Sequence, residues 1–459
     1  MQKKYPIKSI ILTLIYLLST PTFSSDNHLT LVIGEYKNTA GMTLPLMATS
    51  NTQGESWSFP KIPLPDVYKD RFFKVACNAE HCIAVGEKYL DFFFSTTLNQ
   101  GKSWISDSFE KNATVADVQC NSRMCLVVGQ SNLLPFLIID NNKGSAWTHP
   151  KDIIEKIPPN KAVIFNSASC AEEFCGVAGG YITAENRTKP LIAVSSNQET
   201  TWSYPDINPP EHSGYSIGQL QTIHCKDETC IASGQYHLAS QHIQGKPNAL
   251  PLIAISVTKG NTWTFPNIPN TPFPLDHELR PEYYLRKVNC EGSFCLAVGT
   301  YSGIWTPPLL MISHDKGNSW SYPEEIIKKA PTDLRMEGFH DFSCQENFCM
   351  VVGWGEVAPF PITPGQKKPL IAITRDKGTT WSYVTLNLPK NANGIFEKIS
   401  CKGDTCVIGA RESYLKENGK EIPLLAVSHD RGLTWTYPLD MNPSVLPIDF
   451  SKGEFNGIN

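Results

Sequence analysis

Fourteen cysteines, arranged as seven identical pairs, constrain this chain more than any other feature of its sequence. Every pair has the spacing Cys-x-x-x-x-Cys, and no cysteine is left over. An even number of regularly spaced cysteines is typical of a disulfide framework. We therefore predict seven local disulfides, each across one tight turn, between the following partners: Cys77 and Cys82, Cys120 and Cys125, Cys170 and Cys175, Cys225 and Cys230, Cys290 and Cys295, Cys344 and Cys349, Cys401 and Cys406.

A metal or redox role is the alternative for these cysteines. A structural zinc site needs two cysteine pairs that converge on one ion. Seven equivalent pairs spread along a chain of 459 residues do not converge easily. We therefore expect structural disulfides, with no bound metal and no cofactor.

The N-terminus has the features of a secretory signal peptide. Lys3, Lys4 and Lys8 precede a mostly apolar stretch at residues 10–18, and Thr22 and Ser24 supply the small residues of a cleavage site. The apolar stretch is short for a membrane span, although an uncleaved anchor is the alternative. We predict a signal peptide over residues 1–24 and a single domain over residues 25–459. The mature protein is then exported, either periplasmic or secreted, with no membrane span.

The composition favours a packed, turn-rich domain. Aromatic residues make up 10% of the chain, and 34 prolines and 31 glycines provide for many turns, as an all-β chain needs. Charged residues make up 18%, and the formal net charge is −4. This balance offers no basic surface for nucleic acid, so we expect no nucleic-acid partner.

A second repeat runs through the chain and ends in a tryptophan each time. Its clearest copies are SHDKGNSWSYP at 313–323, TRDKGTTWSY at 374–383 and SHDRGLTWTYP at 428–438. The tryptophans recur every 43–61 residues, which lies in the range of propeller blades and far above that of leucine-rich repeats. They are Trp57, Trp104, Trp147, Trp202, Trp263, Trp320, Trp381 and Trp435.

One repeat can be divided into four strands, here called A to D in chain order. In the stretch 285–323, strand A covers 285–290 and ends at a cysteine, and strand B covers 294–301. Strand C covers 307–313 and strand D covers 319–323. Strand B has the short apolar run of a buried strand between turn residues. The disulfide then closes the A–B turn, and the phrase DKGNS makes the C–D turn.

The pattern Ser-x-Asp-x-Gly-x-x-Trp resembles the Asp-box, or bacterial neuraminidase repeat, of sialidases and sortilin-type receptors. The resemblance covers nearly the whole mature chain and implies that each box joins strands C and D of a propeller blade. It also implies a structural role for Asp315, Asp376 and Asp430 and for the eight tryptophans. The matches are uneven: the acidic position holds Asn99, Asn142 and Asn197 or, further from the pattern, Thr52 and Thr258, and Glu199 replaces the glycine.

The number of blades follows from comparing the two repeats. There are eight tryptophan turns but seven cysteine pairs, and the first tryptophan is preceded by strands B and C without a strand A. The C-terminal tail contains SVLPIDFS at 444–451, which could supply the missing strand and remove an exposed edge. We predict an all-β fold, a single propeller of about eight four-stranded blades. The N- and C-terminal strands share a blade. Seven blades is the alternative, and we expect a monomer.

Alternating strand direction places the A–B and C–D turns on one face and the longer B–C and D–A connections on the other. Variable loops on a rigid scaffold commonly carry binding sites. Near the end of strand B an aromatic residue often occurs at the loop-bearing face, and packing between blades is the alternative role for it. The candidate ligand-binding residues are Tyr36, Tyr181, Tyr236, Tyr301, Trp354 and Arg411.

These features predict a non-catalytic exported propeller that binds a glycan or a protein through its loop-bearing face. A glycoside hydrolase of sialidase type is the alternative. The resemblance then implies an arginine triad and an Arg-Ile-Pro phrase, where this chain has Lys61-Ile62-Pro63. Lysine cannot reproduce the bidentate guanidinium contact with a carboxylate, and we predict no catalytic residue. An assembly or scaffold factor for an envelope complex is a second alternative.

Overall fold

The computed structural model describes residues 29–459 apart from short segments, and the predicted signal peptide at 1–24 lies outside the described residues. The segments left out are 64–69, 79–80, 89–90, 110–111, 141–146, 158–161, 196–200, 211–214, 239–248, 270–281, 303–307, 332–333, 358–366, 391, 394, 418, 439–445 and 448.

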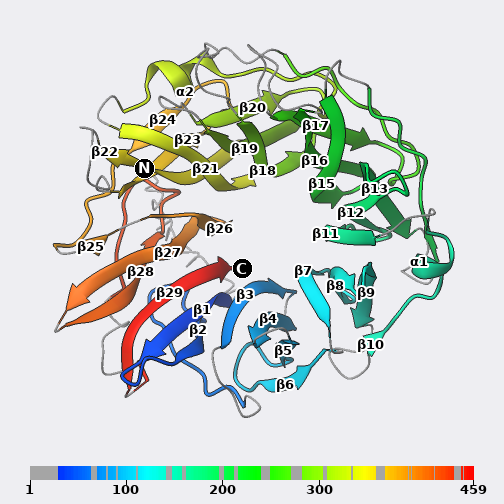
Figure 1. The fold of residues 1–459 in the computed structure, drawn as a ribbon. Helices are drawn as coiled ribbons and strands as arrows, with labels where there is room; N and C mark the ends of the chain where they lie inside the picture. The colour runs from blue at the N-terminus through cyan, green and yellow to red at the C-terminus, as the bar shows by residue number, and fades with distance from the viewer. Residues whose placement is uncertain are drawn as a thin grey trace, which may run out of the picture.

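The described chain is built almost entirely from antiparallel strands that repeat in the predicted A–B–C–D order (Figure 1). We call each such set a unit. The first units in chain order are β3 (Asp70–Cys77), β4 (Cys82–Lys88), β5 (Asp91–Thr97) and β6 (Ile105–Ser108); β7 (Ala113–Cys120), β8 (Cys125–Ser131), β9 (Leu134–Asp140) and β10 (Trp147–Thr148); and β11 (Ala162–Cys170), β12 (Cys175–Ile182), β13 (Thr188–Ser195) and β14 (Trp202–Ser203).

The later units follow the same order. They are β15 (Tyr215–Lys226), β16 (Thr229–Leu238) and β17 (Ala249–Ser256); β18 (Glu282–Glu291), β19 (Phe294–Ser302) and β20 (Leu309–Ser313); β21 (Leu334–Gln345), β22 (Phe348–Val357), β23 (Lys367–Thr374) and β24 (Ser382–Val384); and β26 (Lys398–Lys402), β27 (Thr405–Glu417) and β28 (Lys420–Ser428), with the short β25 (Ala392–Asn393) also paired to β27. Where strand D is a single bridge, it joins Ile255 to Thr264, Ile312 to Ser321, and Val427 to Thr436.

The chain ends are joined in one unit. β29 (Phe450–Ile458) pairs antiparallel with β1 (Thr30–Asn38), which in turn pairs with β2 (Thr43–Ser50). The C-terminal strand therefore supplies strand A to a unit whose B and C strands come from the N-terminus, as predicted. The predicted position at 444–451 is wrong, because Pro447 starts a turn in which its carbonyl accepts a hydrogen bond from the Phe450 amide. The strand begins only after that turn.

The A strands form a closed circle around the centre of the fold (Figure 1). Going round, each contacts the next in the order β29, β3, β7, β11, β15, β18, β21, β26 and back to β29. The described hydrophobic clusters each lie between two neighbouring units, including one between the β1–β2 unit and the β3–β6 unit. The fold is therefore a β-propeller, in which each unit is held mainly by its two neighbours.

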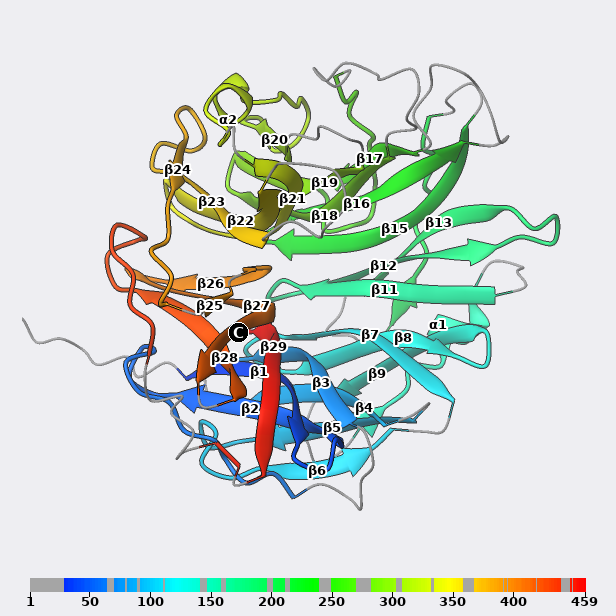
Figure 2. The ribbon, with the colours of Figure 1, turned by 60° about the vertical axis from the view of Figure 1, so that its left-hand side comes forward.

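Single bridges fuse some neighbouring units into larger sheets. Thr300 of β19 pairs with Gly338 of β21, Ala249 of β17 pairs with Glu282 of β18, and Glu421 of β28 pairs with Lys452 of β29. These bridges produce a seven-stranded and a ten-stranded sheet beside three four-stranded ones. Sheet pairing alone therefore does not divide the fold into blades, and the count of eight stays a prediction. Figure 2 shows how the sheets fan out in succession.

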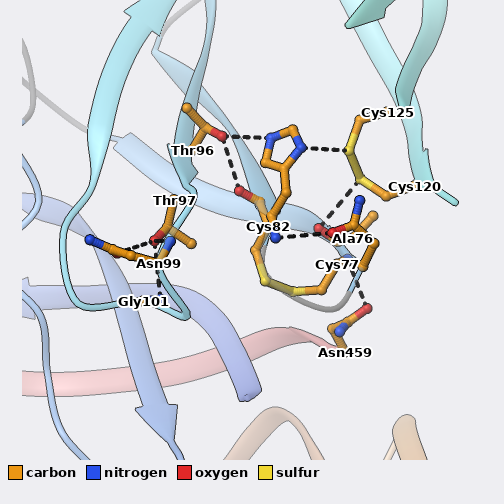
Figure 3. The surroundings of a disulfide bond; sticks show 12 residues. Ala76, Cys77, Cys82, Thr96, Thr97, Asn99, Gly101, Cys120, Cys125 and Asn459 are labelled. Carbon is orange, nitrogen blue, oxygen red and sulfur yellow. Dashed lines mark hydrogen bonds between the residues drawn. A yellow bond between two sulfur atoms is a disulfide. The ribbon is translucent and has the colours of Figure 1, made fainter. Parts of the chain in front are cut away.

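All seven predicted disulfides are present. Each joins a cysteine at or next to the end of an A strand to a cysteine at the start of the following B strand. The structure contains no free cysteine. Figure 3 shows the first of these turns, where the Cys77 amide donates a hydrogen bond of 3.1 Å to Asn459 Oδ1 at the end of the chain. A polar side chain of one unit thus holds the disulfide turn of the next.

The C–D turn is stabilised by a repeated set of hydrogen bonds. In the clearest copy, Asp315 Oδ1 accepts from the Ser319 amide, Asp315 Oδ2 accepts from the Ser319 hydroxyl, and the Gly317 amide donates to Ser313 Oγ. Gly317 has a φ of 86°, and an added Cβ would lie 2.7 Å from Ile255 Cδ1 of the preceding unit. The glycine is required both for the turn and for close packing between units.

The units that depart from the aspartate pattern keep the same geometry. Thr52 Oγ1 accepts from the Ser56 amide at 2.8 Å, and Thr258 Oγ1 accepts from the Thr262 amide at 2.9 Å. Asn99, which Figure 3 also labels, accepts the corresponding bond at Oδ1 from the Ser103 amide at 2.9 Å. What the turn needs is therefore a short side chain with an acceptor oxygen, which threonine and asparagine also provide.

Two single-turn helices, which were not predicted, lie in D–A connections of the described chain: α1 (Asp152–Glu155) and α2 (Glu324–Lys328). Each binds the tryptophan of the following unit. The Trp202 amide donates to Asp152 Oδ2, and the Trp381 amide donates to Glu325 Oε2. The phrases KDIIEK and EEIIKK, each soon after a proline, are the sequence signal that marks both helices.

Candidate functional site

The inner A strands share a β-bulge that controls which side chains line the inside of the circle. In β3, β7, β11, β18 and β21 the pairing with the B strand skips one residue, as between Phe72 and Lys74 or between Phe339 and Asp341. A bulge inserts one unpaired residue and re-aims the side chains beside it. It therefore lets polar side chains reach sideways to the next A strand while the flanking apolar residues stay in the core.

In these strands the residue after the bulge lies three positions before the first cysteine of the pair. We call the residues at this position in all seven repeats the inner polar ring: Lys74, Asp117, Ser167, Thr222, Lys287, Asp341 and Lys398. Lys74 Nζ lies 3.2 Å from Asp117 Oδ1, and Lys287 Nζ lies 2.6 Å from Asp341 Oδ1. Each ion pair thus joins the ring residue of one A strand to that of the next.

The two aspartates of the ring also bind the backbone of the following strand. Asp117 Oδ2 accepts from the Ser167 hydroxyl at 2.9 Å and from the Ala168 amide at 3.2 Å. Asp341 Oδ2 accepts from the Ile399 amide at 3.3 Å. Burial alone would raise the pKa of Asp341, but the charges of Lys287 and Lys398 and these hydrogen bonds hold it below the usual value. Asp341 therefore stays ionised at neutral pH.

A second group of side chains surrounds the predicted candidate Trp354, and we call it the mouth cluster: His340 of β21, Trp354 of β22, Lys367 of β23 and Glu397, which immediately precedes β26. Trp354 Nε1 donates to Glu397 Oε1 at 3.3 Å. The Trp354 ring is stacked with His340, with centroids 6.3 Å apart, and Lys367 Nζ lies 4.7 Å from the Trp354 ring centroid. Two neighbouring units thus meet in this cluster.

His340 is the bulge residue of β21 and is electrically neutral at neutral pH. Burial and the positive charges of Arg286 and Lys398 lower the pKa of His340 to about 4. Its Nδ1 lies 3.8 Å from Glu397 Oε1, beyond hydrogen-bonding distance. Its Nε2 is buried and has no hydrogen-bond partner among the described residues. Buried polar atoms without a hydrogen-bond partner are uncommon in folded proteins, so this one calls for an explanation.

Three of the other candidate residues have packing contacts in the structure. Tyr236 is 2% exposed and donates its hydroxyl to the Pro210 carbonyl, and burial raises its pKa to about 12. Tyr36 stacks on Phe450 with ring centroids 5.7 Å apart. Tyr181 is half-buried at the edge of a hydrophobic cluster. The contacts of Tyr181 and Tyr236 fit the alternative that the aromatic residues near the ends of the B strands pack between units, whereas Tyr36 packs within its own unit.

The side chains of the remaining two candidates fall outside the described residues. Tyr301 lies in β19 and Arg411 in β27. The long predicted loop between β16 and β17 likewise includes residues 239–248, which are not described.

The sequence analysis identified Trp354 but missed His340, Glu397 and the inner polar ring. A signal was present, because aligning the chain on the first cysteine of each pair puts a polar residue three positions earlier in all seven repeats. Apolar residues dominate the flanking positions, which hides this polar column when each strand is considered alone.

No group of three or more histidine, cysteine, aspartate or glutamate side chains in the described part of the chain could hold a metal ion. No helix among these residues is long and apolar enough to span a bilayer.

Comparison with known proteins finds only distant similarity between structures. No family model and no curated protein matches the sequence. Among solved structures, the chain is similar to a GH74 xyloglucanase from Xanthomonas campestris, with a TM-score of 0.43 and 13% identity over 89% of this chain and 67% of that one. It is also similar to YCF48 from Cyanidioschyzon merolae, with a TM-score of 0.42 and 13% identity over 82% of this chain and 100% of that one.

A Trypanosoma rangeli sialidase in complex with sialic acid gives a TM-score of 0.40 and 11% identity, over 87% of this chain and 57% of the sialidase. The β-propeller domain of the Trilobed protease from Pyrococcus furiosus gives 0.43 and 9%, over 78% of this chain and 96% of that one. All of these TM-scores are below 0.5 and all of these identities are 13% or less. The similarities are therefore distant, and the Asp-box resemblance stays a prediction.

Proposed function

We propose that this chain is an exported, non-catalytic β-propeller that binds a segment of a protein ligand at its loop-bearing face, through the mouth cluster. One observation carries the proposal: two neighbouring units bring His340, Trp354 and Glu397 together there, with His340 Nε2 buried and unpaired among the described residues. A neutral imidazole nitrogen and a carboxylate suit the amide groups and polar side chains of a peptide.

The geometry favours a protein over a glycan ligand. A sugar needs an open aromatic face on which to stack, and the Trp354 ring is already contacted by both His340 and Lys367. Tyr36 and Tyr236 have packing contacts of their own. The experiment below distinguishes a protein ligand from a glycan ligand.

The charges also favour binding over glycoside hydrolysis. A glycosidase needs one carboxyl group that stays protonated near neutral pH, opposite a second carboxylate. In the inner polar ring, Asp341 is paired with Lys287 and accepts backbone hydrogen bonds, and its pKa is held below the usual value. Asp341 is therefore not suited to act as a general acid.

Substitution of His340 by alanine is expected to weaken ligand binding about tenfold, the effect of losing one buried hydrogen bond of roughly 1.5 kcal/mol. The mature protein is immobilised and used to isolate a ligand from the envelope and medium of its source, and the affinity of the purified ligand is measured by calorimetry. Leu433→Ala is the matched control, because Leu433 is 71% exposed in a C–D turn on the opposite face.

Three outcomes would contradict the proposal. The first is equal affinity of wild type and His340→Ala, and the second is a loss caused by Leu433→Ala. The third is turnover of a fluorogenic sialoside or glycoside that disappears in Glu397→Gln, which would make the chain an enzyme. The glycan alternative would be supported by a ligand that binds only through its glycan and binds His340→Ala as tightly as the wild-type protein.

A further inference from the structure

The inner polar ring has a regular direction, and Lys398 is the place where its pattern of charge pairing stops. Lys74 reaches the ring residue of the next A strand, Asp117, and Lys287 reaches Asp341. By the same rule, Lys398 should face the corresponding residue of β29. The backbone of Lys398 pairs with Gly409 of β27, but its ammonium group has no hydrogen bond or ion pair to any described residue.

The position in β29 that corresponds to the ring is occupied by Gly457. The register shows the correspondence: the B-strand glycine pairs with Phe455 in β29, as Gly86 pairs with Phe72 in β3 and Gly353 with Phe339 in β21. The ring residue is two positions further along in each strand, and glycine has no side chain to offer the lysine. Beyond Gly457 the circle continues to Lys74.

Lys398 lies among charges of both signs. Burial lowers the pKa of Lys398, the carboxylates of Asp341 and Glu397 act to raise it, and the charges of Lys74 and Lys287 act to lower it. Asp341 already accepts from Lys287 Nζ and from two backbone amides. Lys398 therefore keeps its three donors for something other than this carboxylate.

From the ring geometry we propose an oxyanion-binding site inside the circle of A strands, with Lys398 as its central ligand and Lys74 on the far side of Gly457. The group bound is a carboxylate, sulfate or phosphate, which accepts charge-assisted hydrogen bonds from ammonium groups. It is carried by an acidic ligand or present as a free inorganic ion. This inference goes beyond the proposed function, because it does not require the mouth cluster to bind anything.

The test uses selenate as the probe, because its selenium can be located by anomalous diffraction. Crystals of the mature protein soaked in selenate are expected to show an anomalous selenium peak beside Lys398. The oxygens of the bound selenate should lie about 2.7–2.9 Å from Lys398 Nζ. Selenate affinity measured by calorimetry is expected to fall at least tenfold in Lys398→Met, which keeps the apolar stem. Lys102→Met, at an exposed lysine in a C–D turn, is the control of equal charge and should bind as wild type.

A second variant tests the ring rule independently. Gly457→Asp supplies the carboxylate that the pattern lacks, so it should pair with Lys398 and abolish selenate binding. An added Cβ there lies 3.1 Å from Ile33 Cγ1, so a thermal melt is needed to show that the variant is folded. An acidic peptide that displaces selenate identifies a ligand carboxylate as the source, and selenate binding without displacement identifies a free ion.

Selenate found only at other lysines would overturn the site, as would unchanged affinity in Lys398→Met. Equal ligand affinity of wild type and His340→Ala, together with selenate bound at Lys398, would overturn the proposed function and leave the oxyanion site standing.

Discussion

Deletion of residues 450–459 is expected to leave the protein without a cooperative unfolding transition. These residues form β29, the strand that joins the chain ends. Phe450 and Phe455 are 0% and 1% exposed and pack with Val32, Trp57 and Val427. Loss of two buried phenylalanines costs about 6–10 kcal/mol at the usual 3–5 kcal/mol each, which is comparable to the whole stability of a typical domain.

The deletion also opens the circle of A strands. β1 then presents an unpaired edge, which promotes aggregation. The measurement is a thermal melt by circular dichroism with size-exclusion chromatography. Lys452→Ala is the matched control in the same strand, since it removes one surface ion pair with Glu421 and should change stability by less than about 1 kcal/mol. A truncated protein that melts cooperatively at the wild-type temperature would show that β29 does not close the fold.

Replacement of Asp341 by alanine is expected to destabilise the folded protein by about 3 kcal/mol. Asp341 is 7% exposed, and its loss removes the acceptor for Lys287 Nζ and for the Phe342 and Ile399 amides. Breaking a buried pair costs about 3–5 kcal/mol, and the low end applies because the Lys287 side chain is 38% exposed and can turn to water. Asp341→Asn keeps an acceptor oxygen and should cost about half as much.

The effect of Asp341 depends on pH in a definite direction. Its pKa is lowered in the folded protein, so its stabilising contribution is complete above the unfolded value of about 3.9 and is lost as the pH falls through the folded value. The stability difference between wild type and Asp341→Ala, measured by denaturant unfolding, should therefore shrink below about pH 4. Asp107→Ala, at an exposed aspartate of β6, should differ from wild type by less than about 0.5 kcal/mol at any pH. A wild-type stability for Asp341→Ala at pH 7 would contradict the role of the ring.

The scaffold could be predicted because its determinants are local in sequence. Each cysteine pair closes a turn of four residues, and each C–D turn is completed by side chains within one short phrase, as with Ser313, Asp315 and Gly317. Closure through the C-terminal tail could also be predicted, from the missing strand A. Its position was misjudged because an apolar run was given more weight than Pro447, which cannot donate to a ladder.

The candidate site could be predicted only in part, because it is made by contacts between units. Trp354 stood out as an aromatic residue near the end of a B strand, but its partner Glu397 lies 43 residues further on and belongs to the neighbouring unit. The bulge that aims His340 depends on the pairing of two strands, which no single strand reveals. The packing of Tyr236 on the Pro210 carbonyl is likewise a contact that residue type alone does not indicate.

The central claim is that one closed circle of disulfide-clasped units is completed by pairing of the two chain ends. It is tested most directly by mapping the disulfides of the double variant Lys37→Cys with Lys452→Cys. These exposed residues are register partners in β1 and β29, at the separation a disulfide can bridge. Mass spectrometry of non-reduced peptides should find a new link between positions 37 and 452 beside the seven Cys-x-x-x-x-Cys links. Free thiols at 37 and 452, or links between cysteines of different units, would contradict it.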